Sequence, residues 1–278
     1  MSYDTIKKYY DYTLPLYRIF YHKQSNALHF GFWDDTVSTH QEALLNVNKY
    51  MANKARIVQG DRILDAGCGI GGSTMWLAEN YDIEAVGITI SDRQVRKAKY
   101  LAKEKGLQDR AIFYKKDYID TDFEDESFTV VWAIESVCHT VDKKDFIKEA
   151  YRLLRPGGRL IVDDGFLLRD PENDQEAYDL DSFLEGMAVP NLARDTEFHF
   201  SLIEAGFKNV SVENKVKDVM ASSERIHKLS TWSYPLSKWT ERLRLTPSLL
   251  TKNNLAGITQ YRIIKNGIMG HRVFYAEK

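Results

Sequence analysis

Short apolar runs alternate with amphipathic stretches through the middle of the chain. The apolar runs predict strands at 61–66, 83–89, 111–115, 128–134 and 158–164. Apolar residues at three- and four-residue spacing predict intervening helices at 73–80, 92–105 and 143–154. Residues that end helices follow two of them: Gly106 follows the helix at 92–105, and Pro156-Gly157 follows the helix at 143–154. Such alternation is typical of a doubly wound, mostly parallel α/β sheet with right-handed crossovers.

The two ends of the chain add elements to this core. A helix is expected over 40–55, and a helix at 196–205 with strands at 208–214 and 272–276 completes seven strands. From 169 to 195 the sequence is acidic and loosely patterned, and it predicts no element.

We therefore expect three parts. A Rossmann-like core is formed by 56–217 and 259–278, a helical N-terminal cover by 1–55, and a helical lid over an acceptor pocket by 218–258. For 218–258 the alternative is a helical hairpin that only buries its own apolar face.

Composition limits the class of protein. Hydrophobic residues make up 44% of the 278 positions and charged residues 28%, which is ordinary for a globular protein. A formal charge of −2 disfavours nucleic-acid binding. Cys68 and Cys138 are expected to be free thiols, with no disulfide and no metal site. The chain lacks a long apolar run and a signal peptide, so we expect a cytoplasmic monomer or homodimer without stable membrane insertion.

The most informative segment is the glycine turn Asp65-Ala66-Gly67-Cys68-Gly69, which lies between the first predicted strand and its helix. Gly67, Gly69 and Gly72 also fit a dinucleotide pattern, which leaves an NAD-linked oxidoreductase open. Asp65 argues against a pyrophosphate beside it and suits a cationic amino group.

The turn resembles motif I of the class I S-adenosylmethionine (SAM) methyltransferases. Further segments, Gly87-Ile88-Thr89-Ile90-Ser91, Ile134-Glu135-Ser136-Val137-Cys138-His139 and Arg155-Pro156-Gly157-Gly158, resemble the tocopherol, sterol and deoxysugar methyltransferases of that class. The resemblance covers about residues 25–165 and implies SAM as the cofactor. It implies that the following residues bind SAM: Asp65, Gly67, Cys68, Gly69, Thr89, Ile90, Gln94, Asp117, Tyr118 and Glu135.

One position departs from most of that class. The acid that usually holds the ribose after the second strand is replaced here by Thr89 and Ser91, so we expect Gln94 to contact the ribose. Asp117 takes the place that holds the adenine amino group, and the alternative is a solvated loop aspartate.

Methyl transfer from SAM requires no metal, but it requires removal of a proton from most acceptors. By resemblance to a sugar O-methyltransferase, His139 is expected to act as general base, with Asp164 orienting its imidazole. Glu135 is expected to position the loop or the cofactor's amino group. Two alternatives stay open: His139 makes only a structural hydrogen bond, or Glu135 stabilises a carbocation during C-methylation of a sterol or isoprenoid alkene.

Aromatic residues concentrate in 1–55 and 218–258, beyond what packing of helices requires. From these segments we expect Tyr21, His29, Trp33, Trp232 and Trp239 to bind the acceptor. The sequence thus predicts a SAM-dependent methyltransferase acting on a small, largely apolar or amphipathic molecule through O- or C-methylation. A non-catalytic SAM-binding protein is the remaining alternative.

Overall fold

The structure, a computed structural model, describes residues 6, 12, 26, 27 and 29–278. The strands are β1 (Arg62–Ala66), β2 (Glu84–Thr89), β3 (Ala111–Lys115), β4 (Phe128–Ile134), β5 (Leu154–Leu167), β6 (Lys208–Asn214) and β7 (Met269–Glu277). The helices are α2 (His40–Lys54), α3 (Gly72–Asn80), α4 (Asp92–Glu104), α5 (Lys143–Leu153), α6 (Asp174–Gly186), α7 (Asp195–Glu204), α8 (Val216–Arg242) and α9 (Ser248–Lys265), with a short 3₁₀ helix η2 (Val137–His139).

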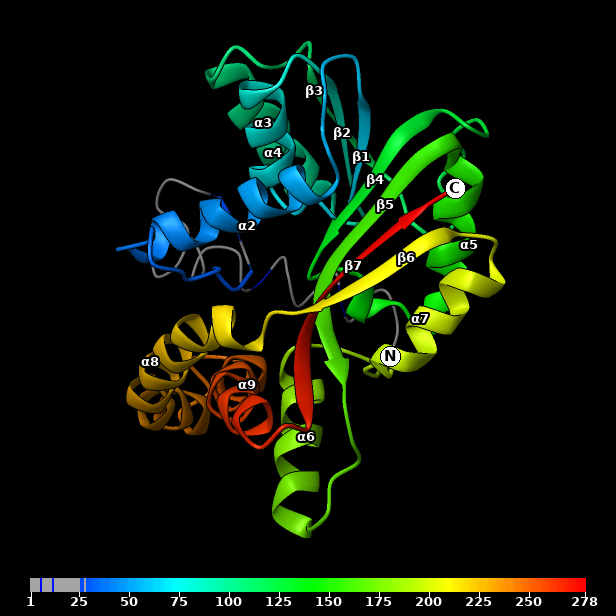
Figure 1. Cartoon of the computed structure of the whole chain (residues 1–278). Helices are drawn as coiled ribbons and strands as arrows, with labels where there is room; N and C mark the ends of the chain where they lie inside the picture. Colours follow the sequence, from blue (N-terminus) through cyan, green and yellow to red (C-terminus); the bar gives the residue numbers. More distant parts are fainter. Residues whose placement is uncertain (1–5, 7–11, 13–25, 28) are drawn as a thin grey trace.

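The seven strands form one sheet in the order β3-β2-β1-β4-β5-β7-β6 (Figure 1). Neighbours from β3 to β5 are parallel, and β7 is antiparallel to both β5 and β6. The prediction of a doubly wound, mostly parallel seven-stranded sheet is confirmed. Because β1, β4 and β2 run in the same direction, the loops after them meet at one edge of the sheet.

Helices cover both faces of the sheet. α2, α3 and α4 lie on one face, where Val47, Met51, Met75 and Leu77 pack against buried strand residues such as Trp132. On the other face, α5 and α7 contribute Phe146, Ile147, Phe198 and Leu202 to a second buried cluster. The strands between these layers, β1, β2 and β4, are therefore buried and apolar along most of their length.

A third group of helices, α6, α8 and α9, lies beyond the carboxyl ends of the parallel strands (Figure 1). α6 falls within 169–195, where no element was predicted, so that prediction was wrong. A helix start was present there, because the Asn173 side chain accepts the backbone N–H of Glu176 and acids occupy the first turn. α8 and α9 form the hairpin expected from 218–258, and α9 continues past that range to Lys265.

Only part of the predicted N-terminal cover lies within the described residues. Its described helix is α2, which begins with a capping box between Thr39 and Glu42. None of the helices in the described part of the chain combines the length and apolar character that a membrane span requires.

Close packing of α6 on α9 yields the first prediction. A Cβ atom at Gly186 would lie 2.2 Å from the Lys252 carbonyl oxygen and 2.7 Å from the Ala256 side chain. Gly186→Ala must push the two helices apart, and we expect it to lower the free energy of unfolding by about 1–3 kcal/mol in urea titrations. Asp181→Ala, at an exposed position of the same helix, should change it by less than about 0.5 kcal/mol. Equal effects of the two substitutions would contradict close packing at Gly186.

Candidate active site

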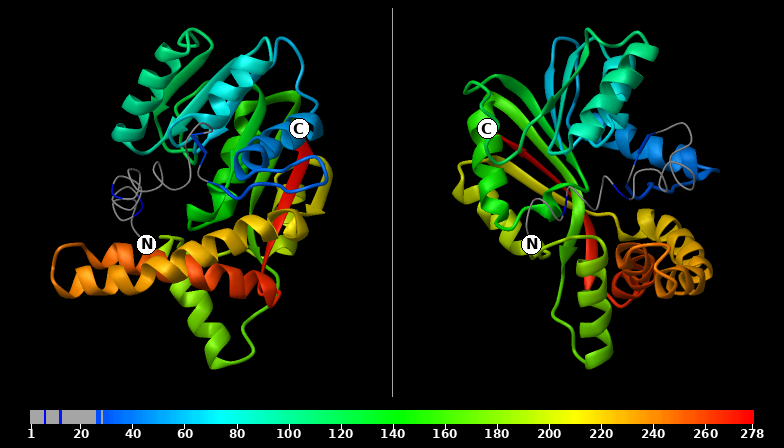
Figure 2. Two further views of the ribbon diagram at one scale, coloured as in Figure 1. Left: turned by 90° about the vertical axis from the view of Figure 1, so that its left-hand side faces the viewer. Right: turned by 180° about the vertical axis from the view of Figure 1, so that it is seen from behind.

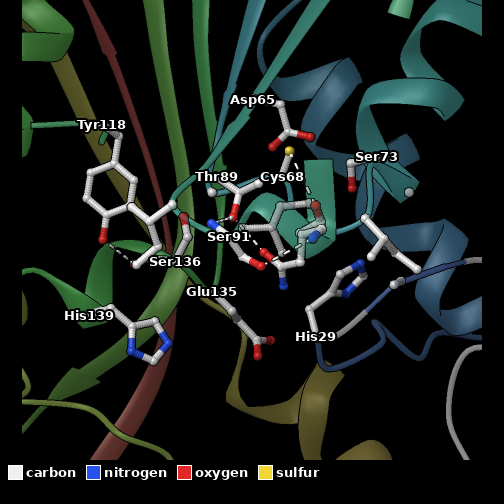
Figure 3. Close-up of a pocket in the computed structure, with 18 of the residues that line it drawn as sticks. His29, Asp65, Cys68, Ser73, Thr89, Ser91, Tyr118, Glu135, Ser136 and His139 are labelled. Carbon is white, nitrogen blue, oxygen red and sulfur yellow. Dashed lines mark hydrogen bonds between the residues drawn. The ribbon is translucent and has the colours of Figure 1, made fainter. Parts of the chain in front are cut away.

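A cavity of about 110 Å³ lies where the loops after β1, β2, β3 and β4 meet (Figure 3). All of the residues predicted to bind the cofactor line it: Asp65, Gly67, Cys68, Gly69, Thr89, Ile90, Gln94, Asp117, Tyr118 and Glu135. Asp65 and Cys68 lie at one end of the close-up, and Glu135 and His139 lie at the other. We call this space the cofactor cavity.

The glycine turn is shaped by left-handed backbone and close packing. Gly67 has φ +90°, and a Cβ there would lie 2.4 Å from Cβ of Ser136. Ser136 in turn donates a hydrogen bond to the Ala66 carbonyl at 2.6 Å, which ties the loop after β4 to the turn. Gly69 differs, because with φ +55° its Cβ would meet nothing within 4 Å. Gly69 therefore leaves its backbone open to the cavity, whereas Gly67 allows two loops to touch.

Asp65 is a buried carboxylate at the end of β1. Its Oδ2 accepts a hydrogen bond from Oγ1 of Thr74 at 2.6 Å. Burial raises the pKa of Asp65 to about 6, although the hydrogen bonds from Thr74 act in the opposite direction. A cationic group in the cavity would favour the ionised form.

The loops after β2, β3 and β4 are joined by side-chain hydrogen bonds. Thr89 donates to the Gln94 side-chain oxygen at 2.5 Å, which closes the turn into α4. The Tyr118 hydroxyl donates to the Ser136 carbonyl at 2.8 Å. Asp117 Oδ1 accepts the Ile119 N–H at 3.1 Å, so this carboxylate is held within its loop. The cavity wall is thus held together by hydrogen bonds between the protein's own residues.

A second, larger cavity of about 460 Å³ lies next to the first, beneath α6, α8 and α9. We call it the acceptor cavity. Its wall is mainly apolar and includes Phe183, Met187, Ile226, Leu229 and Leu250. None of the described residues that line either cavity is Lys or Arg. Such a space suits an uncharged, largely apolar ligand.

Four residues line both cavities: Ala27, His29, Glu135 and His139. The polar groups of the boundary are thus two imidazoles and one carboxyl. His29 donates from Nδ1 to the Phe30 carbonyl at 2.7 Å, and its buried Nε2 has no hydrogen-bond partner among the described residues. Burial lowers the pKa of His29, so its imidazole is neutral.

Glu135 follows β4 with φ +42°, a left-handed conformation that is uncommon for a residue with a side chain. Its backbone N–H donates to the Asp163 carbonyl at 2.7 Å, and its Oε1 accepts the Phe30 N–H at 2.7 Å. Burial raises the pKa of Glu135 to about 8, against the opposing effect of His271. The strained backbone therefore aims a carboxyl of unusual basicity at the boundary between the cavities.

His139 lies at the end of η2. Its Nδ1 hydrogen-bonds the Ala188 carbonyl at 3.0 Å, which places the proton on Nδ1 and the lone pair on Nε2. Burial lowers the pKa of His139 to about 4. The structure corrects the predicted role of Asp164, whose oxygens accept the backbone N–H groups of Cys138 and Gly165. The turn after α6 supplies the carbonyl that orients the imidazole, and Asp164 holds the loop instead.

Sequence reasoning missed the buried pair of His271 and Asp163. Nε2 of His271 lies 2.7 Å from Oδ1 of Asp163 and 3.9 Å from Oε1 of Glu135. The contact with Asp163 is an ion pair whose geometry is not that of an aligned hydrogen bond. The three donor atoms lie within 4.8 Å of one another, a spacing that a metal ion could also use. The sequence does contain a signal for this pair, because an acid and a histidine each lie inside an otherwise apolar strand. Buried charges require partners, so the two residues could have been expected to pair.

Only some of the residues predicted to bind the acceptor line one of the two cavities. His29 lines both cavities, and Trp232 lines the acceptor cavity although 79% of its surface is exposed. Trp33 is corrected, because its Nε1 donates to Ser222 at 2.9 Å and it lines neither cavity. Trp239 is 59% exposed and lines neither cavity as well. Tyr21 lies outside the described residues.

The chain matches the mycolic acid cyclopropane synthetase family over residues 1–244. It is 36% identical to 27-O-demethylrifamycin SV methyltransferase of Amycolatopsis mediterranei over 67% of this chain and 68% of that protein. It is 33% identical to a sterol 24-C-methyltransferase of Saccharomyces cerevisiae over 68% of this chain and 48% of that protein. For tocopherol O-methyltransferase of Arabidopsis thaliana, the identity is 36% over 49% of this chain and 42% of that protein.

Coverage differs between these relatives and the solved structures. The chain spans about half the length of the sterol enzyme that it matches. The crystal structure of the [4+2]-cyclase SpnF, in contrast, superposes over 98% of this chain and 94% of that chain, with a TM-score of 0.81 and 25% identity. The family match includes α6 and α8 and ends before α9, whereas the structural superposition covers nearly the whole chain.

The His271–Asp163 pair gives a pH-dependent prediction. Burial lowers the pKa of His271, but Asp163 outweighs burial and raises it to about 9. The folded state thus holds a proton that an unfolded histidine loses near pH ~6.5. This stabilisation, on the order of 3 kcal/mol, is fully present below pH ~6.5 and is lost as the pH rises through about 9.

His271→Gln should therefore reduce the free energy of unfolding by about 3–5 kcal/mol near neutral pH and flatten its pH dependence in that window. Adding Asp163→Asn removes the unpaired charge, so the double variant should be more stable than the sum of the single effects predicts. His227→Gln is the control, since this histidine bonds a backbone carbonyl and lines neither cavity. Additive single effects in urea titrations would show that the two residues are not coupled.

Proposed function

The chain belongs to the mycolic acid cyclopropane synthetase family of class I SAM-dependent methyltransferases, and on this premise we propose that it methylates a neutral, largely apolar small molecule. The observation that carries the proposal is the boundary between the two cavities. There, His29, Glu135 and His139 line the glycine-walled cofactor cavity and the larger acceptor cavity at once. A transfer reaction needs its two ligands in contact, and this boundary is the place where they would meet.

The cofactor cavity passes a direct test of fit. Gly69 lines it, and a Cβ at that position would project into open space that a ligand could use. When bound, SAM supplies an activated methyl group. Asp65 would be ionised above its pKa of about 6 and would hold the ammonium group. Gln94 would hold the ribose, and Asp117 the adenine amino group.

The chemistry of the acceptor cavity supports an uncharged acceptor. The cation among its described lining residues is His271, and this side chain is already paired with Asp163. The other polar groups are mainly hydroxyls, amides and imidazoles, so no unpaired Lys or Arg is present there for a phosphate or carboxylate. Helices α6, α8 and α9 would exclude water from the acceptor, which is the lid role predicted for 218–258. The bound molecule would therefore be held by shape and apolar contact, with one polar atom directed to the boundary.

We assign proton removal to His139. Its Nε2 carries the lone pair, and its low pKa keeps the imidazole neutral across the neutral range, so it can accept a proton from a hydroxyl. The second candidate is C-methylation of an alkene with Glu135 as the stabilising anion. Its support is that Glu135 also faces the boundary and that a sterol C-methyltransferase is among the relatives.

Gly69→Ala tests the cofactor. The new methyl group should occupy the cradle, so the thermal shift produced by S-adenosylhomocysteine should fall strongly. Gly60→Ala is a matched control, since Gly60 also has positive φ and open space but lines neither cavity. Both variants should lose about 1 kcal/mol of stability from backbone strain, and only Gly69→Ala should lose affinity. A larger shift with NAD than with S-adenosylhomocysteine would overturn the assignment.

The pH dependence of kcat distinguishes His139 acting as general base from Glu135 acting as a stabilising anion. With His139 as base, kcat should be flat across neutral pH and fall only as the pH decreases toward 4. With Glu135 as the active anion, kcat should instead rise as the pH increases through about 8. We expect His139→Ala to reduce the rate by roughly 10²–10⁴-fold with little change in cofactor affinity.

The matched control is His227→Ala, which should retain the wild-type rate. Acceptors would be screened by mass spectrometry for the gain of a methyl group. A full rate in His139→Ala together with an inactive Glu135→Gln would favour C-methylation. Conversion of the acceptor without gain of a methyl group would refute methyl transfer.

A further inference from the structure

The α8–α9 hairpin carries large apolar side chains on its outer surface. They are Trp232, Leu236, Trp239, Leu243 and Leu245, which we call the hairpin stripe. Their exposed fractions are 79%, 56%, 59%, 50% and 68%. The first four recur at intervals of four, three and four residues, so Trp232, Leu236 and Trp239 lie along one side of α8, and Leu243 follows them at its C-cap. Exposed apolar residues are common singly, but a continuous row of this kind marks an interaction site.

The stripe occupies the part of the hairpin that projects from the body of the protein. In Figure 2 (left), the α8–α9 hairpin extends away from the sheet, and its orange tip, which holds this segment, lies at the far end. Trp232 and Leu236 also line the acceptor cavity. The apolar surface outside the protein is therefore continuous with the apolar wall of the cavity.

The charges around the stripe are positive. The segment from Trp232 to Thr246 contains three basic residues, Lys238, Arg242 and Arg244. It contains one acid, Glu241, so its net charge is +2. The whole chain carries −2, so this segment opposes the net charge of the protein. All three basic residues are exposed, and none forms an ion pair with an acidic group of the described residues.

We propose that the hairpin stripe docks the protein on an anionic lipid surface. Tryptophan and leucine favour the boundary between headgroups and acyl chains, and lysine and arginine favour anionic headgroups. The hairpin stripe supplies the tryptophan and leucine side chains. The lysine and arginine side chains are those of Lys238, Arg242 and Arg244. The attachment is peripheral, and it brings the side of the acceptor cavity lined by Trp232 and Leu236 to the lipid. Docking itself does not depend on the identity of the methyl acceptor.

The test is sedimentation of the full chain with vesicles of phosphatidylcholine alone or of phosphatidylcholine with phosphatidylglycerol. We expect binding to the anionic vesicles, with a blue shift of tryptophan emission, and much weaker binding to the neutral ones. Raising salt from about 0.1 M to about 1 M shortens the Debye length from ~10 Å to ~3 Å and should release the protein. Failure to bind the anionic vesicles, or equal binding to both kinds, would overturn the proposal.

Substitutions locate the surface. Trp239→Ser with Leu243→Ser removes two stripe residues that line neither cavity, so the thermal shift with S-adenosylhomocysteine should persist. The partition coefficient for anionic vesicles should fall by roughly tenfold or more. Phe200→Ser with Ile203→Ser removes two exposed apolar residues of α7 and should leave it unchanged.

A charge variant completes the test. Lys238→Glu with Arg244→Glu should abolish the preference for anionic vesicles while leaving the fold intact, as checked by circular dichroism. An equal loss of binding in the α7 variant would overturn the assignment to the hairpin. If the wild type forms a dimer that Trp239→Ser with Leu243→Ser dissociates, and neither binds vesicles, the stripe is a subunit interface and the proposal fails.

Discussion

The buried ion pair between His271 and Asp163 is the contact on which the boundary between the two cavities depends. Asp163 lies on β5 and His271 on the antiparallel strand β7, so the pair fixes the central strands to one another. Glu135, at the end of β4, lies 3.9 Å from the same imidazole and accepts the Phe30 N–H. Two acids would be costly to bury together, and one protonated histidine between them reduces that cost. The insertion of β7 beside β5 therefore helps to hold the Glu135 carboxyl at the boundary between the two cavities.

The acceptor cavity has a different origin. Its apolar wall is contributed by α6, α8 and α9, which follow β5, β6 and α8 in the chain and gather beyond the carboxyl ends of the parallel strands (Figure 1). The same turn after α6 supplies the Ala188 carbonyl, which orients His139. The turn that follows this wall helix thus sets the tautomer of His139, a boundary residue. Changes in the packing of α6 on α9 are expected to reach His139 through this carbonyl.

The similarity to known proteins also differs between the parts of the chain that form the two cavities. The family match runs from residue 1 to 244 and stops before α9, which contributes Leu250, Asn253 and Gln260 to the acceptor cavity. Relatives named for rifamycin and sterol methylation align over about two thirds of the chain. The shared part contains the glycine turn and the loop with Glu135 and His139.

The sequence alone predicted the seven strands, the glycine turn and ten of the residues that line the cofactor cavity. It could do so because strand and helix periods are local, and because the carboxyl ends of parallel strands must share one edge. Tertiary structure decided the rest. The contacts of Glu135 with Phe30, His139 with Ala188 and Asp163 with His271 join residues that are distant in the chain, and no local period encodes them. Likewise, the sequence predicted a helical lid or hairpin over 218–258, but only the packing of the helices decided that Trp232 and Trp239 are exposed.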